Sequence, residues 1–278
     1  MRRITLLTNP DKCNLRCALC FLRQRGIVSY SGEMPFETAK AAIEKYAAER
    51  DEAGNLLLKE VIPSTMGEPL LYSKFENLLH LCEMTGVKMN LTTNGTFPGK
   101  WGTPSVMFEL VQACSDIKIS TLAYEMGGFL RNLWRENVEK LIECRKRRLD
   151  SSATISLQVT LHRENLNDYK DLIAWAETAG VQRIKWNPAV FIPDTSAILE
   201  RRFKLNTQEL ESLRHELLEG TLHSDKIKYE GSLFLEDPTE DCPMSGSCTK
   251  CPFTDETWIW PDGHEDHCPN PKRRWSKF

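Results

Sequence analysis

The chain has 278 residues, ten cysteines and a net charge of −3, so it is long enough for one large α/β domain with a small appendage. The near-neutral charge gives no general attraction to nucleic acid, and no stretch is apolar over the length of a membrane span. Because no secretory signal is present, the cysteines favour free thiols and metal ligands in a reducing cytoplasm over a disulfide framework.

Strands and helices alternate along the chain. An apolar strand is predicted at residues 3–8, and further strands follow at 56–64, 87–92, 116–120, 153–161 and 183–186. Amphipathic helices are predicted between them, at residues 35–50, 72–85, 104–114, 135–148 and 167–179. Six βα units with short strands predict an α/β fold in which a parallel sheet curls with its helices outside.

A loop with three cysteines directly follows the first strand. Cys13, Cys17 and Cys20 have the spacing C-x3-C-x2-C. Three adjacent thiolates with no fourth nearby can hold three irons of a cubane [4Fe–4S] cluster and leave the fourth iron open to a substrate. A zinc site that lacks its last ligand, or cysteines that merely lie near one another, are the alternatives.

Polar segments follow the next strands, at the edge where a parallel barrel carries its working groups. The sequence TMGEP at 65–69 follows the second strand, and TTNG at 92–95 follows the third. Ser120 ends the fourth strand and Gln158 lies near the end of the fifth. Each segment alone is ordinary turn chemistry. Their occurrence after consecutive strands predicts one site at this edge.

The segment from Cys13 to Cys20 resembles the cluster loop of the radical S-adenosylmethionine (SAM) enzymes, whose core is a partial (β/α)6 barrel. The resemblance implies that the open iron binds SAM, and that an electron from the cluster cleaves SAM to a 5′-deoxyadenosyl radical, which abstracts a substrate hydrogen. Two positions depart from the family pattern. Leu19 replaces an aromatic residue that packs near adenine, and Met66 replaces the first glycine of the GGEP motif. The resemblance covers residues 1 to about 190.

The same resemblance implies a set of SAM contacts. The residues predicted to bind SAM are Gly67, Glu68, Asn94, Ser120, Arg131 and Gln158. The GEP segment is expected near the SAM ammonium group, and Gly67 permits a close backbone approach. Ser120 and an arginine are expected to hold the carboxylate and ribose, since an arginine fork donates two parallel hydrogen bonds. Arg135 is the alternative to Arg131.

A second cysteine group lies near the C-terminus. Its members are Cys242, Cys248, Cys251 and Cys268. The segment 257–263 predicts a β-hairpin with Asp-Gly at its turn, which brings Cys251 and Cys268 together. This pattern resembles the SPASM and twitch extensions of radical SAM enzymes, which implies an auxiliary [4Fe–4S] cluster. Cys242 is the least secure ligand, and tetrahedral zinc is the alternative.

The domain division and the reaction follow from these resemblances. Residues 1–205 are predicted to form the radical SAM barrel, and residues 206–278 a linker helix and a twitch-like domain. Because a substrate radical next to an auxiliary cluster can lose a second electron, the predicted outcome is net oxidation, by dehydrogenation or bond formation. A radical SAM epimerase, lyase or cyclase, in which the auxiliary cluster anchors the substrate, and a non-catalytic zinc or iron–sulfur protein are the alternatives.

Partners and further pocket residues complete the predictions. The implied electron donor is a flavodoxin or a ferredoxin. The chain opens directly with a strand, which favours a small natural-product substrate, or a peptide presented by a separate partner. Three further candidates for the pocket wall lie near strand ends: Tyr124, His162 and Trp186. The remaining cysteines are predicted to be buried in or beside helices: Cys82, Cys114 and Cys144.

Overall fold

The computed structural model describes residues 2–10, 12–24, 32–63, 66–191, 196–234 and 256–266. Its strands are β1 (Arg2–Leu6), β2 (Leu58–Pro63), β3 (Lys88–Thr93), β4 (Cys114–Ser120), β5 (Thr154–Leu161), β6 (Arg183–Pro188), β7 (Lys228–Glu230), β8 (Glu256–Ile259) and β9 (Glu265–Asp266). Its α-helices are α1 (Phe21–Gln24), α2 (Phe36–Ala47), α3 (Phe75–Thr85), α4 (Pro104–Ala113), α5 (Leu122–Glu125), α6 (Gly128–Arg147), α7 (Tyr169–Ala179), α8 (Ala197–Phe203) and α9 (Thr207–Leu218).

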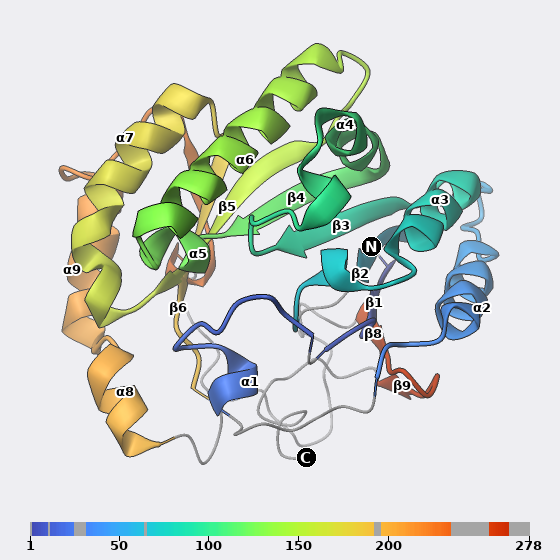
Figure 1. Ribbon diagram of the computed structural model, residues 1–278, viewed down its shortest axis with the longest axis horizontal. Helices are drawn as coiled ribbons and strands as arrows, with labels where there is room; N and C mark the ends of the chain where they lie inside the picture. Colours follow the sequence, from blue (N-terminus) through green and yellow to red (C-terminus); the bar gives the residue numbers. More distant parts are fainter. Residues whose placement is uncertain are drawn as a thin grey trace.

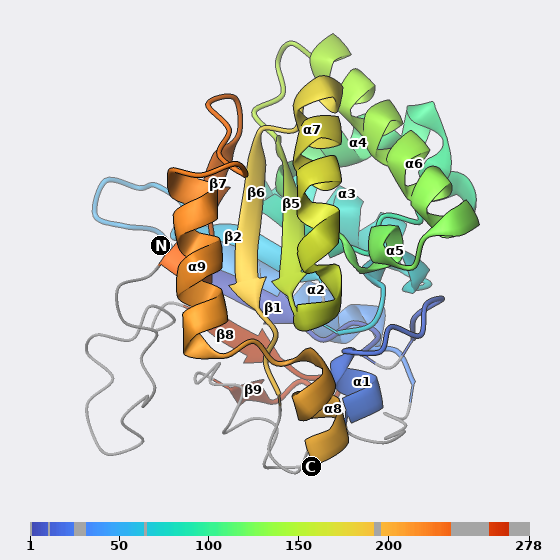
Figure 2. The same ribbon diagram turned by 90° about the vertical axis from the view of Figure 1, so that its left-hand side faces the viewer.

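The strands form one curled sheet. Over the described residues its order is β7-β6-β5-β4-β3-β2-β1-β8-β9, and β8–β9 is the antiparallel pair in an otherwise parallel sheet. Helices α2, α3, α4, α6, α7 and α9 lie along the outside of the sheet (Figure 1). Strands β5 and β6 run toward the end where α1 and α8 lie (Figure 2). The predicted α/β fold with a curled parallel sheet is confirmed.

The six strands predicted between residues 3 and 186 correspond to β1–β6. Helix α3 ends at Thr85, and the next residue, Gly86, caps it in a left-handed conformation with φ 72°. The helix end predicted at this glycine is therefore confirmed. Helix α6 begins at Gly128, earlier than the predicted start at residue 135. Two glycines at 127 and 128 argue against a helix by propensity. The buried Trp134 nevertheless ties this first part of α6 to the core.

The sheet has two chemically different faces because side chains alternate along a strand. On β4, Ile117 and Ile119 point outward and are 0% exposed within the main apolar core. Asp116 and Ser120 point to the inner, concave face, where Asp116 bonds to β5 and β6. The outer face thus packs against helices, and the inner face is polar.

The C-terminal part joins the same sheet. β7 pairs with β6, and β8 pairs with β1. The predicted hairpin is present, since Trp258 pairs with Asp266 across β8 and β9. The predicted auxiliary ligands Cys242, Cys248, Cys251 and Cys268 lie outside the described residues, so this ligand set and the boundary at residue 205 stay predictions. In the part of the chain that is described, no helix has the length and apolarity needed to cross a membrane.

Candidate functional site

A cavity of about 340 Å³ lies where the parallel strands end. The three cysteines of the first loop line one side of it, and side chains from the ends of β3, β4, β5 and β6 line the rest. Seven of the residues predicted for the site line it: Cys13, Cys17, Cys20, Gly67, Asn94, Ser120 and Gln158. The topology therefore brings together cavity-lining segments that are up to 177 positions apart, from residue 13 to residue 190.

The three thiols lie within electrostatic reach of one another. Burial and, to a smaller extent, the neighbouring charges of Cys20 and Cys13 together raise the pKa of Cys17 to about 12. Burial also raises the pKa of Cys13, against the backbone N–H of Leu15. Such a place is unfavourable for three bare thiolates. A bound cationic centre would reverse this, because metal coordination lowers thiol pKa values.

The sulfur of Cys13 accepts hydrogen bonds suited to a ligand thiolate. The N–H of Leu15 lies 3.4 Å from Sγ and the Nδ2 of Asn94 lies 3.7 Å from it. Across the described ranges, no three His, Cys, Asp or Glu side chains converge on the position of a single metal ion. A cubane distributes its ligands over separate irons, so its thiolates need not meet at one point. Three thiols on one cavity wall are a donor set that could hold three irons of such a cluster.

Gly67 holds the cysteine loop against the end of β2. It has φ 73°, and a Cβ there would lie 2.4 Å from the carbonyl oxygen of Asn9 and 2.7 Å from that of Lys12. The N–H of Glu68 donates to the carbonyl of Lys12 at 2.8 Å, and Asn9 Nδ2 donates to the carbonyl of Glu68 at 2.7 Å. Only glycine fits at this position, because the backbone here lies against the backbone of the segment that leads into the cysteine loop.

Glu68 is 0% exposed and does not line the cavity. Its Oε2 accepts from the N–H of Asn94 at 2.7 Å, and its Oε1 accepts from Thr93 Oγ1 at 2.8 Å and from the N–H of Leu70 at 3.2 Å. Burial raises the pKa of Glu68 to about 7, although these hydrogen bonds act in the opposite direction. The carboxylate therefore joins the ends of β2 and β3 and has no open side toward a ligand.

Asn94 connects the end of β3 to the cysteine loop. Its Nδ2 donates to Asn14 Oδ1 at 2.8 Å as well as facing Cys13 Sγ, and its Oδ1 accepts from Thr96. Asn14 Nδ2 in turn donates to Thr96 Oγ1 at 2.9 Å. This ring of bonds fixes the loop that carries Cys13 relative to the sheet.

The opposite wall presents polar groups that are open to a ligand. Ser120 pairs with Gln158 in the register of β4 and β5. Ser120 Oγ accepts from the N–H of Leu122 at 3.4 Å, whereas the side-chain amide of Gln158 has no hydrogen-bond partner among the described residues. Thr160, which the sequence reasoning missed, lies two positions further along β5 and also lines the cavity. Period-two alternation starting from Gln158 is the signal that identifies it.

Neither predicted arginine lines the cavity. Arg131 donates from Nε to the carbonyl of Tyr124 at 2.9 Å and from Nη2 to Asp168 at 3.2 Å, and its guanidinium lies 4.4 Å from the Tyr124 ring centre. Arg135 donates to the hydroxyl of Tyr124 at 3.2 Å and lies over Trp175. Both side chains are thus engaged beside α5 and α7.

The three additional pocket candidates lie in different surroundings. Tyr124 and Trp186 are 0% exposed within the core, so they do not form the cavity wall. His162 lies beyond the end of β5, and its Nε2 is 2.8 Å from the Oε2 of Glu125. Glu125 also accepts from Thr121 at 2.8 Å, and its charge contributes to the raised pKa of Cys17. This Glu125–His162 pair was not predicted from sequence, because Glu125 lies on the short helix α5.

The sequence was compared with families and with known proteins. No family model matches the sequence. The "Tungsten-containing aldehyde ferredoxin oxidoreductase cofactor-modifying protein" of Pyrococcus furiosus is 22% identical over 179 residues, which cover 62% of this chain and 47% of the relative. The chain thus spans about half the length of that protein.

Solved structures match more of the chain. SuiB of Streptococcus suis bound to S-adenosylmethionine matches 96% of this chain and 60% of its own, with a TM-score of 0.64 and 15% identity. The protein anSMEcpe with bound AdoMet matches 96% of this chain and 74% of its own, with a TM-score of 0.62 and 16% identity. Both are radical SAM enzymes, and the resemblance inferred from the cysteine loop is confirmed for the fold.

Proposed function

We propose, from the fold that this chain shares with radical SAM enzymes, that it binds a [4Fe–4S] cluster through Cys13, Cys17 and Cys20 and SAM in the adjoining cavity. The observation that carries the proposal is that these thiols and the amide of Gln158, which has no hydrogen-bond partner in the described part of the chain, line one cavity of about 340 Å³. The bound cluster and SAM would supply a hydrogen-abstracting radical, which is chemistry that protein side chains lack.

The chain's own residues orient these groups. Asn94 and the N–H of Leu15 hold Cys13, and the buried Glu68 holds the loop that precedes Asn94. Leu19 is 8% exposed and lines the cavity, so it adds apolar surface next to the thiols and limits the access of water. Gln158 offers a donor and an acceptor to a bound ligand.

We further propose that Cys242, Cys248, Cys251 and Cys268 bind an auxiliary [4Fe–4S] cluster and that the reaction ends in net oxidation of a small molecule or a peptide. The support is the cysteine spacing and the β8–β9 hairpin that precedes Cys268. A flavodoxin or ferredoxin would supply electrons, and a reducing cytoplasm suits so many thiols.

Anaerobic reconstitution tests the proposal. We expect about eight irons per chain for two clusters, and 5′-deoxyadenosine formed from SAM when dithionite is present. Replacing the four C-terminal cysteines by alanine should leave about four irons and SAM cleavage, whereas the matched variant Cys144→Ala should retain about eight. Zinc in place of iron, together with no SAM cleavage, would establish a non-catalytic metal protein. Solvent deuterium uptake without oxidation of the product would indicate an epimerase.

A further inference from the structure

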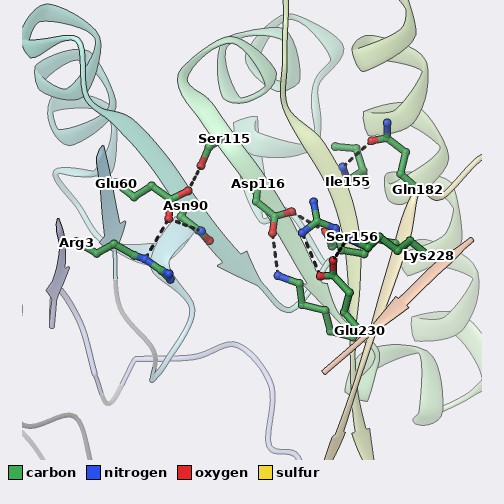
Figure 3. Close-up of polar contacts among 12 residues, drawn as sticks. Arg3, Glu60, Asn90, Ser115, Asp116, Ile155, Ser156, Gln182, Lys228 and Glu230 are labelled. Atoms are coloured by element: carbon green, nitrogen blue, oxygen red, sulfur yellow. Dashed lines mark hydrogen bonds and ion pairs between the residues drawn. The ribbon is translucent and has the colours of Figure 1, made fainter. Parts of the chain in front are cut away.

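The inner face of the sheet carries charged side chains below the cavity. Figure 3 shows Glu60, Asn90, Asp116 and Ser156 on neighbouring strands at this inner face. On β4, Asp116 and Lys118 precede Ser120 on the same face of the strand. Lys118 is thus about 6–7 Å along the strand from the cavity wall, at about 3.3 Å per residue.

Most charged side chains on this inner face form hydrogen bonds or ion pairs with one another. The Oε1 of Glu60 accepts from Ser115 at 2.6 Å, and the Oε2 of Glu60 lies 3.7 Å from Nε of Arg3. Asp116 accepts from Ser156 at 2.6 Å and from Lys185 at 3.1 Å. Each carboxylate is therefore bonded to a hydroxyl and paired with a cation.

A second ion-pair group lies at the β6–β7 edge. Arg183 pairs with Glu230 at 3.2 Å, and Lys228 pairs with the same carboxylate at 2.7 Å. Figure 3 shows Glu230 and Lys228 on this side of the inner face. The cations of this edge are therefore also engaged.

Lys118 is the exception. It lies between Thr92 of β3 and Ser156 of β5 in the sheet register and is half-buried. Its Nζ forms no hydrogen bond or ion pair with any residue that the structure describes. Burial lowers its pKa to about 8, the charge of Lys185 adds to this, and the charges of Asp116 and Glu60 oppose it. An unpaired cation in such a place is costly to retain.

Asn90 supplies a second unpaired group, on the neighbouring strand. Its side chain is buried, and Nδ2 donates to Glu60 Oε2 at 3.0 Å, which fixes the orientation of the amide. Its Oδ1 is buried and has no hydrogen-bond partner. Asn90 precedes Thr92, the register partner of Lys118, by two positions on the same face. An unpaired donor and an unpaired acceptor therefore occur on adjacent strands.

We infer that Lys118 binds the carboxylate of the substrate below the SAM cavity, and that Asn90 Oδ1 accepts from a hydroxyl or an amine next to that carboxylate. The substrate class is thus an α-hydroxy or α-amino carboxylate. A single carboxylate suits one unpaired lysine, whereas the flanking Glu60 and Asp116 would repel a doubly charged phosphate. This inference rests on the proposed function, because it assigns the substrate of the same site.

Ligand binding tests it without requiring SAM cleavage. The reconstituted protein, saturated with SAM so that the open iron is occupied, is titrated with L-lactate and with L-alanine and followed by ligand-observed NMR. Propionate lacks the second polar group, and propane-1,2-diol lacks the charge. The variants are Lys118→Met, Lys118→Arg and, as a matched control, Lys59→Met, which alters an exposed lysine on β2.

We expect L-lactate or L-alanine to bind saturably, and Lys118→Met to weaken the binding about tenfold or more, as for the loss of a charge-assisted hydrogen bond. Lys118→Arg should retain binding within about threefold because it keeps the charge, and Lys59→Met should bind like the wild type. The diol should not bind, and propionate should bind more weakly than lactate.

The inference is overturned if neither acid binds, or if binding is the same in Lys118→Met. Propionate binding as tightly as lactate would remove the role given to Asn90. These outcomes are separate from the proposed function. Iron and SAM cleavage with no acid binding refute only the substrate class, whereas Lys118-dependent acid binding without an assembled cluster refutes the radical mechanism.

Discussion

The two faces of the same sheet differ in chemistry, one being apolar and the other polar. On the outer face of β4, Ile117 and Ile119 are 0% exposed against the helices. On the inner face, Asp116, Lys118 and Ser120 meet a polar space or the cavity. Within β4, Ile117 and Ile119 therefore pack in the core, whereas Ser120 lines the cavity. Substitutions on the two faces should accordingly have separable effects.

The largest effect is expected at the cavity. Cys17→Ser removes one thiolate of the proposed cluster, and serine is a poor ligand for iron–sulfur clusters, so iron at this site and SAM cleavage should both be lost. Burial already raises the pKa of Cys17 to about 12, so its thiolate depends on a bound metal. Iron analysis and 5′-deoxyadenosine quantification measure the result.

The matched control is Cys144→Ala, which removes a buried thiol of α6 that lies apart from the cavity. It should keep iron and SAM cleavage, with at most a modest loss of stability. Retention of both activities in Cys17→Ser would show that the first loop does not hold the cluster.

A substitution on the outer face should lower stability and leave cluster assembly intact. Ile119→Ala leaves a cavity in the core and should lower the free energy of unfolding by about 2–4 kcal/mol, measured by urea denaturation of the apoprotein. The folded fraction should still assemble the cluster, since the side chain of Ile119 points away from the cavity. Iron content that falls while stability is unchanged would contradict the separation of the two faces.

Sequence alone predicted the parts of this site that depend on strand order. Cys13, Gly67 and Asn94 follow strands, Ser120 ends β4 and Gln158 lies in the last half of β5, and parallel strands bring their C-terminal ends to one edge. Local chemistry also predicted the β8–β9 hairpin, because Asp-Gly specifies the turn.

Contacts between side chains distant in sequence were not predictable in this way. Glu68 was expected near SAM but is enclosed by donors from β3, and Arg131 is held by Asp168, which lies 37 positions away. Lys118 was not among the residues predicted from sequence, because only the fold shows that neighbouring cations and carboxylates pair without it. Propensity rules detect elements and their ends, whereas such pairings depend on the three-dimensional packing.

A smaller loss of stability is expected at Glu68, which joins the ends of β2 and β3. In Glu68→Gln the new amide places a donor against one of the groups that now donate to the carboxylate, such as the N–H of Asn94. We expect a loss of about 1–3 kcal/mol in the free energy of unfolding, together with slower cluster assembly. Thermal denaturation and the rate of iron incorporation measure these effects.

The control is Glu76→Gln on the exposed start of α3, where the carboxylate pairs only with the surface Lys100. Its effect should stay within about 0.5 kcal/mol. Equal effects of the two variants would mean that the buried bonds of Glu68 do not hold the cysteine loop.

The smallest change expected is a gain of stability at the inner face. Lys118 is charged at pH 7 in both the folded and the unfolded chain, but the fold lowers its pKa from 10.5 to about 8. The buried charge therefore destabilises the ligand-free protein, and Lys118→Met should raise the free energy of unfolding by about 1–2 kcal/mol at pH 7. Such a gain is typical of a residue that is retained for binding at a cost in stability.

The pH dependence separates this cause from better packing of methionine. Between pH 8 and 10.5 the unfolded chain binds more protons at this lysine than the folded chain, so the wild type gains stability as the pH rises through this window. The advantage of Lys118→Met should therefore shrink from pH 7 to pH 10, whereas Lys59→Met should show no such trend. The charged groups that act on Lys118 are Arg3, Glu60, Asp116 and Lys185, and all four are present in both proteins. A constant advantage across this range would mean that Lys118 does not carry an uncompensated charge in the folded chain.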